Sequence, residues 1–228
     1  WATNLAPDDT NGTSDIFVHD MQTGVTTRVL TGADPTGAGG FAGYDQSISA
    51  NGRYIAFNSN ATNLVPGDTN GTADIFLHDL QTGLTSRVSV DSSGAQADNM
   101  SARLSISADG RYVVFDSYAA NLVSGDTNGS YDIFMHDTQT GATTRVSLDS
   151  NGGQPTSTSV NPSISADGRY VTFSSSATNL VSGDTNAKID VFVHDRQTGT
   201  TRRISITSAG TQANDTSEHP SISADGSL

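Results

Sequence analysis

An internal repeat of about 58 residues constrains this chain more than any other feature of its sequence. The string D-T-N-G-T-S-D-I-F-V-H-D occupies Asp9 to Asp20, and related strings return after steps of 59, 58 and 58 residues. These later copies start at Asp68, Asp126 and Asp184. A second string, typified by S-I-S-A-D-G-R-Y-V-V-F, is out of phase with the first and starts at Ser47, Ser105, Ser163 and, in shortened form, Ser221. Such a chain is expected to stack copies of one unit, because one unit alone cannot bury its apolar faces.

Each period reads as four short strands, which we call a to d. In one period strand a is Ser105–Ser107, strand b is Arg111–Phe115, strand c is Asp132–His136 and strand d is Thr143–Leu148. Apolar and polar residues alternate in c and d, and Gly, Asn and Asp occupy the turns. The pattern predicts an all-β protein, a β-propeller of four-stranded antiparallel blades. A β-solenoid is the alternative, although its coils are usually much shorter.

The repeat predicts one propeller over residues 1–228. Complete blades are expected over 46–90, 104–148 and 162–206, strands c and d of one blade over 1–30, and strand a of a truncated blade over 220–228. This set is one strand short of a closed four-bladed ring, and closing it would leave an unsealed sheet edge. We expect part of a larger propeller, or an arc that pairs with a second copy to give about eight blades. A self-closed four-bladed ring is the alternative.

Composition supports this fold and excludes several functions. The chain has 11 Lys and Arg against 24 Asp and Glu, a formal net charge of −13, which argues against nucleic acid and anionic lipid as partners. No apolar run approaches the roughly 20 residues of a membrane helix, so no membrane insertion is expected. Only Glu218 among the acids is Glu, and helices favour Glu. The absence of Cys excludes disulfides and thiol catalysis.

The D-T-N-G loops are candidate metal sites. Asp, Asn and Asp at positions 1, 3 and 7 offer carboxylate and amide oxygens, which Ca²⁺ prefers, and two unpaired carboxylates would repel each other without a cation. The candidate ligands are Asp9, Asn11 and Asp15; Asp68, Asn70 and Asp74; Asp126, Asn128 and Asp132; and Asp184, Asn186 and Asp190. The fourth loop is weaker, because Ala187 replaces Gly and Lys188 adds a positive charge. The alternative is an Asx-type turn whose Asp bonds backbone amides.

Other repeated polar residues are interpreted as structural. The His–Asp pairs that end strand c recur once per blade, and their Asp is expected to hold the Q-T-G turn. The Arg of R-Y-V-x-F and the series Arg28, Arg87, Arg145 and Arg203 are expected to pair with Asp across strands.

Function is expected where the repeats differ, on the face that carries the d-to-a and b-to-c loops. The residues that differ are Phe41, Tyr44, Met100, Arg103, Tyr118, Tyr131, Glu218 and His219. Aromatic side chains there could bind sugars or a protein surface, and loop drift is the alternative. No G-x-S-x-G, P-loop or H-E-x-x-H motif is present, so no catalytic residue is predicted.

The segments S-A-D-G-R-Y-V-x-F and D-I-F-x-H-D-x-x-T-G resemble the WD-like propeller repeat of the TolB type over essentially the whole chain, and the D-T-N-G insertion resembles a subset of that family. The resemblance implies six to eight blades and a bacterial, exported protein, extracellular or periplasmic. We therefore expect a non-catalytic, calcium-binding scaffold that binds a protein or polysaccharide on the loop face. The alternatives are a lectin-like propeller and the propeller domain of a larger hydrolase.

Overall fold

A computed structural model describes residues 5–6, 15–29 and 42–227, and these residues form fourteen strands and no helix. None of the described residues forms a helix long and apolar enough to cross a membrane. The strands are β1 Phe17–His19, β2 Thr26–Arg28, β3 Ala42–Ile48, β4 Tyr54–Ser59, β5 Asp74–Asp79, β6 Leu84–Arg87, β7 Ser101–Ile106, β8 Tyr112–Ser117, β9 Asp132–Asp137, β10 Thr143–Arg145, β11 Ser159–Ile164, β12 Tyr170–Ser175, β13 Asp190–Asp195 and β14 Thr200–Arg203.

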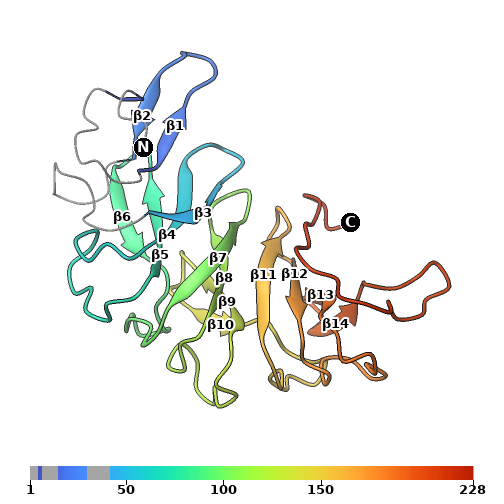
Figure 1. Cartoon of the computed structure of the whole chain (residues 1–228). Helices are drawn as coiled ribbons and strands as arrows, with labels where there is room; N and C mark the ends of the chain where they lie inside the picture. Colours follow the sequence, from blue (N-terminus) through green and yellow to red (C-terminus); the bar gives the residue numbers. More distant parts are fainter. Residues whose placement is uncertain (1–4, 7–14, 30–41, 228) are drawn as a thin grey trace.

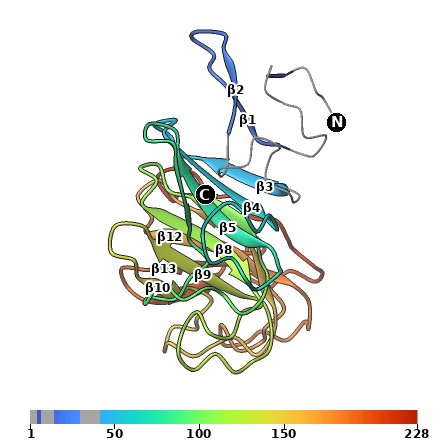
Figure 2. The same ribbon diagram turned by 90° about the vertical axis from the view of Figure 1, so that its left-hand side faces the viewer.

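The strands form three four-stranded antiparallel sheets and one two-stranded sheet, as the repeat predicts. We call β3–β6 blade 1, β7–β10 blade 2, β11–β14 blade 3 and β1–β2 the half-blade. Within each blade the strands follow chain order, and the first strand of each blade packs on the blade before it, β7 on β3 and β11 on β7. The blades follow one another from left to right in Figure 1. Figure 2 shows the half-blade standing away from the three complete blades.

Each blade is centred on a cross-strand pair of phenylalanines. In blade 1, Phe57 of β4 lies opposite Phe76 of β5, with ring centroids 5.8 Å apart and both side chains buried. The same pair recurs in blades 2 and 3 at 6.1 and 5.9 Å. Apolar residues of neighbouring blades form three clusters, each of which fills the space between two consecutive sheets. The core is therefore a series of sheet-to-sheet interfaces, which explains why one unit cannot fold alone.

A tyrosine and a glycine fix the distance between consecutive blades. Gly110, in the A-D-G turn of blade 2, has φ +79°, and a Cβ built there would lie 2.2 Å from the Tyr54 ring of blade 1. Gly168 and Gly226 meet Tyr112 and Tyr170 in the same way, at 2.3 Å. Only glycine fits, since both the left-handed backbone and the close approach exclude a side chain.

The first strand of each blade begins earlier than the sequence indicates. β7 starts at Ser101 rather than near Ser105, because a β-bulge between Ala102 and Leu104 lets the strand continue. Beyond blade 3, residues 220–227 occupy the expected place of a further first strand, and the Ala166 N–H donates to the Ala224 carbonyl at 2.9 Å. They form no strand, because a first strand pairs with the second strand of its own blade, and the described residues contain no such partner there.

Candidate functional site

The D-T-N-G loop of blade 1 is held by a network centred on Asp74, which is fully buried at the start of β5. Asp74 Oδ1 accepts a hydrogen bond from the Ser89 hydroxyl at 2.7 Å. Asp74 Oδ2 accepts from the Gln96 amide at 3.0 Å and from the Asn70 amide at 3.3 Å. The same Gln96 nitrogen donates to Asp68 Oδ1 at 3.0 Å, so one amide joins the two carboxylates.

Asn70 shapes the turn itself. Its side-chain oxygen accepts the Thr72 N–H at 3.0 Å, which is an Asx turn, and its NH2 group also donates to the Ala97 carbonyl at 3.0 Å. The Asx turn weighed as an alternative is thus present, with Asn rather than Asp as the acceptor. The equivalent Asn128 and Asn186 make the same turn.

Arginines of the outermost strands lie beside these carboxylates. Arg87 Nη1 is 3.6 Å from Asp74 Oδ2, and both side chains are buried. In blade 2, Arg145 contacts Asp126 at 3.1 Å and Asp132 at 3.4 Å. In blade 3, Arg203 lies 3.4 Å from both carboxylates of its loop, and Arg28 lies 3.7 Å from Asp15 in the half-blade. The predicted role of this series, pairing with Asp across strands, is confirmed.

The donor set agrees with calcium in kind but not in charge. Carboxylate, amide and hydroxyl oxygens suit Ca²⁺. The amide NH2 groups of Asn70 and Gln96 face Asp74, however, and Arg87 supplies the positive charge that the sequence argument assigned to calcium. Within the described ranges, no three His, Cys, Asp or Glu side chains lie close enough to hold a metal ion. Calcium binding stays a prediction. Asp9 and Asn11 lie outside the described residues.

Burial governs the ionisation of these carboxyls. It raises the pKa of Asp74, and it raises the pKa of Asp132 to about 6 even though Arg145 opposes the shift. The His–Asp pairs behave as structural residues: Asp79 accepts the Gln81 N–H at 2.9 Å and is held by Arg53 at 2.9 and 2.7 Å. Burial lowers the pKa of His78, whose Nδ1 bonds the Thr85 hydroxyl, so the ring is neutral at pH 7.

A second group of polar residues lies where the bulged first strand of blade 2 meets β8. Arg103 has φ +28°, in the left-handed region that a long side chain rarely adopts. Its Nη1 lies 3.1 Å from Oδ2 of Asp116, which is fully buried and also accepts the Asn161 N–H of blade 3 at 3.2 Å. Asp116 Oδ1 is buried and makes no hydrogen bond in the described structure. Burial raises the pKa of Asp116 to about 6.

Two tyrosines and a methionine adjoin this ion pair. The Tyr118 and Tyr131 rings meet edge to face with centroids 5.3 Å apart, and the Tyr118 N–H donates to the Met100 carbonyl at 3.0 Å. Tyr118 and Met100 are 42% and 37% exposed. Burial raises the pKa of Tyr131, with a further contribution from Asp116. We call Met100, Arg103, Asp116, Tyr118 and Tyr131 the blade-2 cluster.

No other complete blade carries this combination. Blade 3 has Thr158, Asn161, Ser174, Ser176 and Ile189 at the five equivalent positions. The sequence comparison singled out four members of the cluster but missed Asp116, although the equivalent residues Asn58 and Ser174 are uncharged. It also missed Gln96 and Ser89, because their contact with the loop depends on how the outer strand folds back. Among the other variable residues, His219 is exposed beside Glu218. The placement of Phe41 and of the Tyr44 side chain lies outside what the structure describes.

Comparison with known proteins gives the fold. No protein-family model and no curated protein matches the chain. Among solved structures, a TolB candidate of Agrobacterium tumefaciens is 19% identical with a TM-score of 0.52, over 81% of this chain and 52% of that one. A prolyl endopeptidase is 16% identical with a TM-score of 0.53, over 86% and 26%. The tricorn protease is 15% identical with a TM-score of 0.51, over 82% and 16%.

The chain spans about half or less of the length of the solved proteins it matches. Identities this low support the fold alone. Together with the three sheets in chain order and the inner strands packed on one another, they settle the architecture. The chain is built of consecutive four-stranded blades of a β-propeller.

Proposed function

We propose that this chain is a non-catalytic binding module whose contact surface is the blade-2 cluster. The observation that carries the proposal is the departure from the repeat: exposed Tyr and Met side chains and a strained Arg replace small or neutral residues at one end of one blade. Residues that only maintain a repeated fold have no reason to differ at one blade. Backbone strain is retained where it serves a site.

The composition of the cluster favours a protein as the partner. Tyr, Met and Arg are the residue types enriched at protein interfaces, and Tyr and Arg dominate their hot spots. Arg103 remains 46% exposed while paired with Asp116, so it has donors left for a partner. A polysaccharide is the second class, because aromatic rings beside polar groups also suit sugars.

The test uses a phage-displayed peptide library as the probe, with a glycan array as the comparison. The variant Met100→Thr/Arg103→Asn/Tyr118→Ser carries the residues of blade 3 at those positions and should therefore fold. Peptides selected on the unmodified chain are expected to lose at least about tenfold in affinity on this variant. The control Lys188→Met, an exposed residue of another loop, should bind as the unmodified chain does.

Two outcomes would reject the proposal. If the selected peptides bind the triple variant and the unmodified chain equally, the cluster is not the contact surface. If only glycans bind, and lose affinity on the variant, the surface is correct and the lectin-like alternative replaces the protein partner. The hydrolase alternative is addressed by the flanking gene sequence, in which a hydrolase domain would be evident.

We further propose that the D-T-N-G loops take up calcium in competition with the adjacent arginine. The support is the donor set of two carboxylates, two amides and one hydroxyl per loop. The guanidinium makes this binding weak, since calcium must displace a buried charge. Calcium would stiffen the face that carries the blade-2 cluster, and would supply no chemistry to a reaction. The proposed extracellular or periplasmic location depends on the TolB-type resemblance and is tested by fractionating the host.

A further inference from the structure

The apolar contacts between consecutive blades follow one rule. Each blade offers apolar residues of its third and fourth strands, and the next blade covers them with a Phe of its third strand and a Leu of its b-to-c loop. Between blades 2 and 3, Met135 and Val146 are covered by Phe192 and Leu180, and all four side chains are buried. The same rule joins blade 1 to blade 2 and the half-blade to blade 1.

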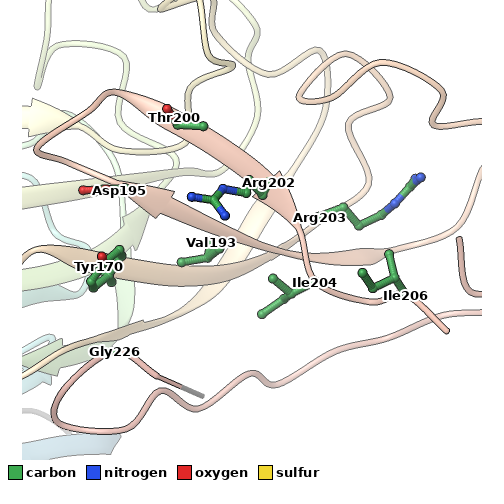
Figure 3. Close-up of a pocket in the computed structure, with 9 residues that line it drawn as sticks. All are labelled: Tyr170, Val193, Asp195, Thr200, Arg202, Arg203, Ile204, Ile206 and Gly226. Carbon is green, nitrogen blue, oxygen red and sulfur yellow. The ribbon is translucent and has the colours of Figure 1, made fainter. Parts of the chain in front are cut away.

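Blade 3 presents the same surface, yet no described residue fully covers it. Val193 and Ile204 are half-buried, whereas the equivalent Met135 and Val146 are 3% and 2% exposed. Ile206 is 50% exposed. The three side chains lie in a row along a pocket of about 350 Å³, with the segment of Gly226 on its far side (Figure 3). We call this surface the trailing face.

The half-blade presents the complementary residues. Phe17 is equivalent to Phe192 and Leu5 to Leu180, which in blade 3 are buried against blade 2. In the half-blade, Leu5 is 48% exposed and Phe17 is half-buried. The other side of the half-blade packs on blade 1 through Ile16, Val18 and Val29. We call the side with Leu5 and Phe17 the leading face.

We propose that the trailing face of one chain docks on the leading face of a second copy, head to tail. The partner is a second copy because the two surfaces reproduce, residue for residue, the contact that joins consecutive blades within the chain. The contact is continuous with the blade series: blade 3 stands to the half-blade of the partner as blade 2 stands to blade 3. Such a contact is heterologous, since it joins two different surfaces.

This geometry makes a prediction that a symmetric contact would not make. A variant of the trailing face and a variant of the leading face each lose self-association, but a mixture of the two recovers one intact contact. The test measures mass in solution by light scattering at micromolar concentration and above. The variants are Ile206→Asp on the trailing face and Leu5→Asp on the leading face, both at exposed positions that should not disturb folding. Leu84→Asp, at a 71% exposed position of blade 1, is the matched control.

The unmodified chain and Leu84→Asp are expected to associate beyond the 23.6 kDa monomer. Each face variant alone should weaken association by about tenfold or more, the loss expected for one buried aliphatic side chain. The equimolar mixture of the two variants should form a dimer. A monomeric unmodified chain would overturn the proposal. So would one face variant that associates like the unmodified chain, because a head-to-tail contact needs both faces.

Discussion

Replacement of Arg145 by Met tests the charge network of the D-T-N-G loops. Arg145 lies 3.1 Å from Asp126 and 3.4 Å from Asp132, and its side chain is 7% exposed against 4% and 0% for the two carboxylates. Its Nε and Nη2 make no hydrogen bonds in the described structure, so these contacts are ionic only. Removing one partner of a buried ion pair costs about 3 to 5 kcal/mol. We expect about 3 kcal/mol, the lower end, since only ionic contacts are lost.

The assay is chemical denaturation at pH 7. A loss of this size is a large part of the roughly 5 to 15 kcal/mol by which domains are stable, so Arg145→Met should unfold at clearly lower denaturant. Lys188→Met is the control: it also removes one positive charge from a loop, but its pair with Asp215 is exposed and should be worth less than about 1 kcal/mol. The loss should shrink toward pH 4, as the stranded Asp132 is protonated. Equal stability of the two variants at pH 7 would refute the reasoning.

Three further outcomes follow from the structure. Gly168→Ala should cost about 2 to 4 kcal/mol in thermal melts, because it adds a collision with Tyr112 to the left-handed backbone, whereas Gly199→Ala, with open space around it, should cost only about 1 to 2 kcal/mol; equal losses would show that the close approach is unimportant. Burial raises the pKa of Asp116 to about 6, so its folded form binds a proton that the unfolded form releases between pH 6 and 4, and the chain should gain about 1 kcal/mol when the pH falls from 7 to 5. Asp116→Asn, the residue blade 1 carries as Asn58, should lack that gain; a pH profile identical to that of the unmodified chain would contradict it. Millimolar calcium should raise the melting temperature of the unmodified chain slightly and of Arg145→Met more, because the competing charge is gone; no change in either would remove calcium from the account.

The repeat was enough to predict the blades, because turn residues and alternation fix where each strand begins and ends. Strand c was placed at Asp132–His136 and ends one residue later, at Asp137. The first strand was too short by four residues, since its bulge at Arg103 interrupts the alternation on which the prediction depended. Strand d was too long, because Val146 to Leu148 leave the ladder to pack between blades.

The polar networks were only partly predictable. The sequence shows that Arg87 recurs in each period and that Asp lies across the sheet from it, which is sufficient to predict pairing. It does not show that Gln96, 22 residues beyond Asp74, folds back to join two carboxylates. Nor does it show that Asp116 is buried, because its neighbours in sequence alternate as in any other second strand. Contacts between loops depend on the packing of sheets, and that information is absent from local pattern.

The central claim is that the blade-2 cluster is where this module contacts its partner. The most direct measurement is a calorimetric titration of the best peptide from the library into the unmodified chain and into Met100→Thr/Arg103→Asn/Tyr118→Ser. Both proteins should show the same unfolding midpoint, since the substituted residues are those of blade 3. The account predicts that affinity falls by at least about tenfold in the substituted chain. Equal affinity for the two proteins would contradict it.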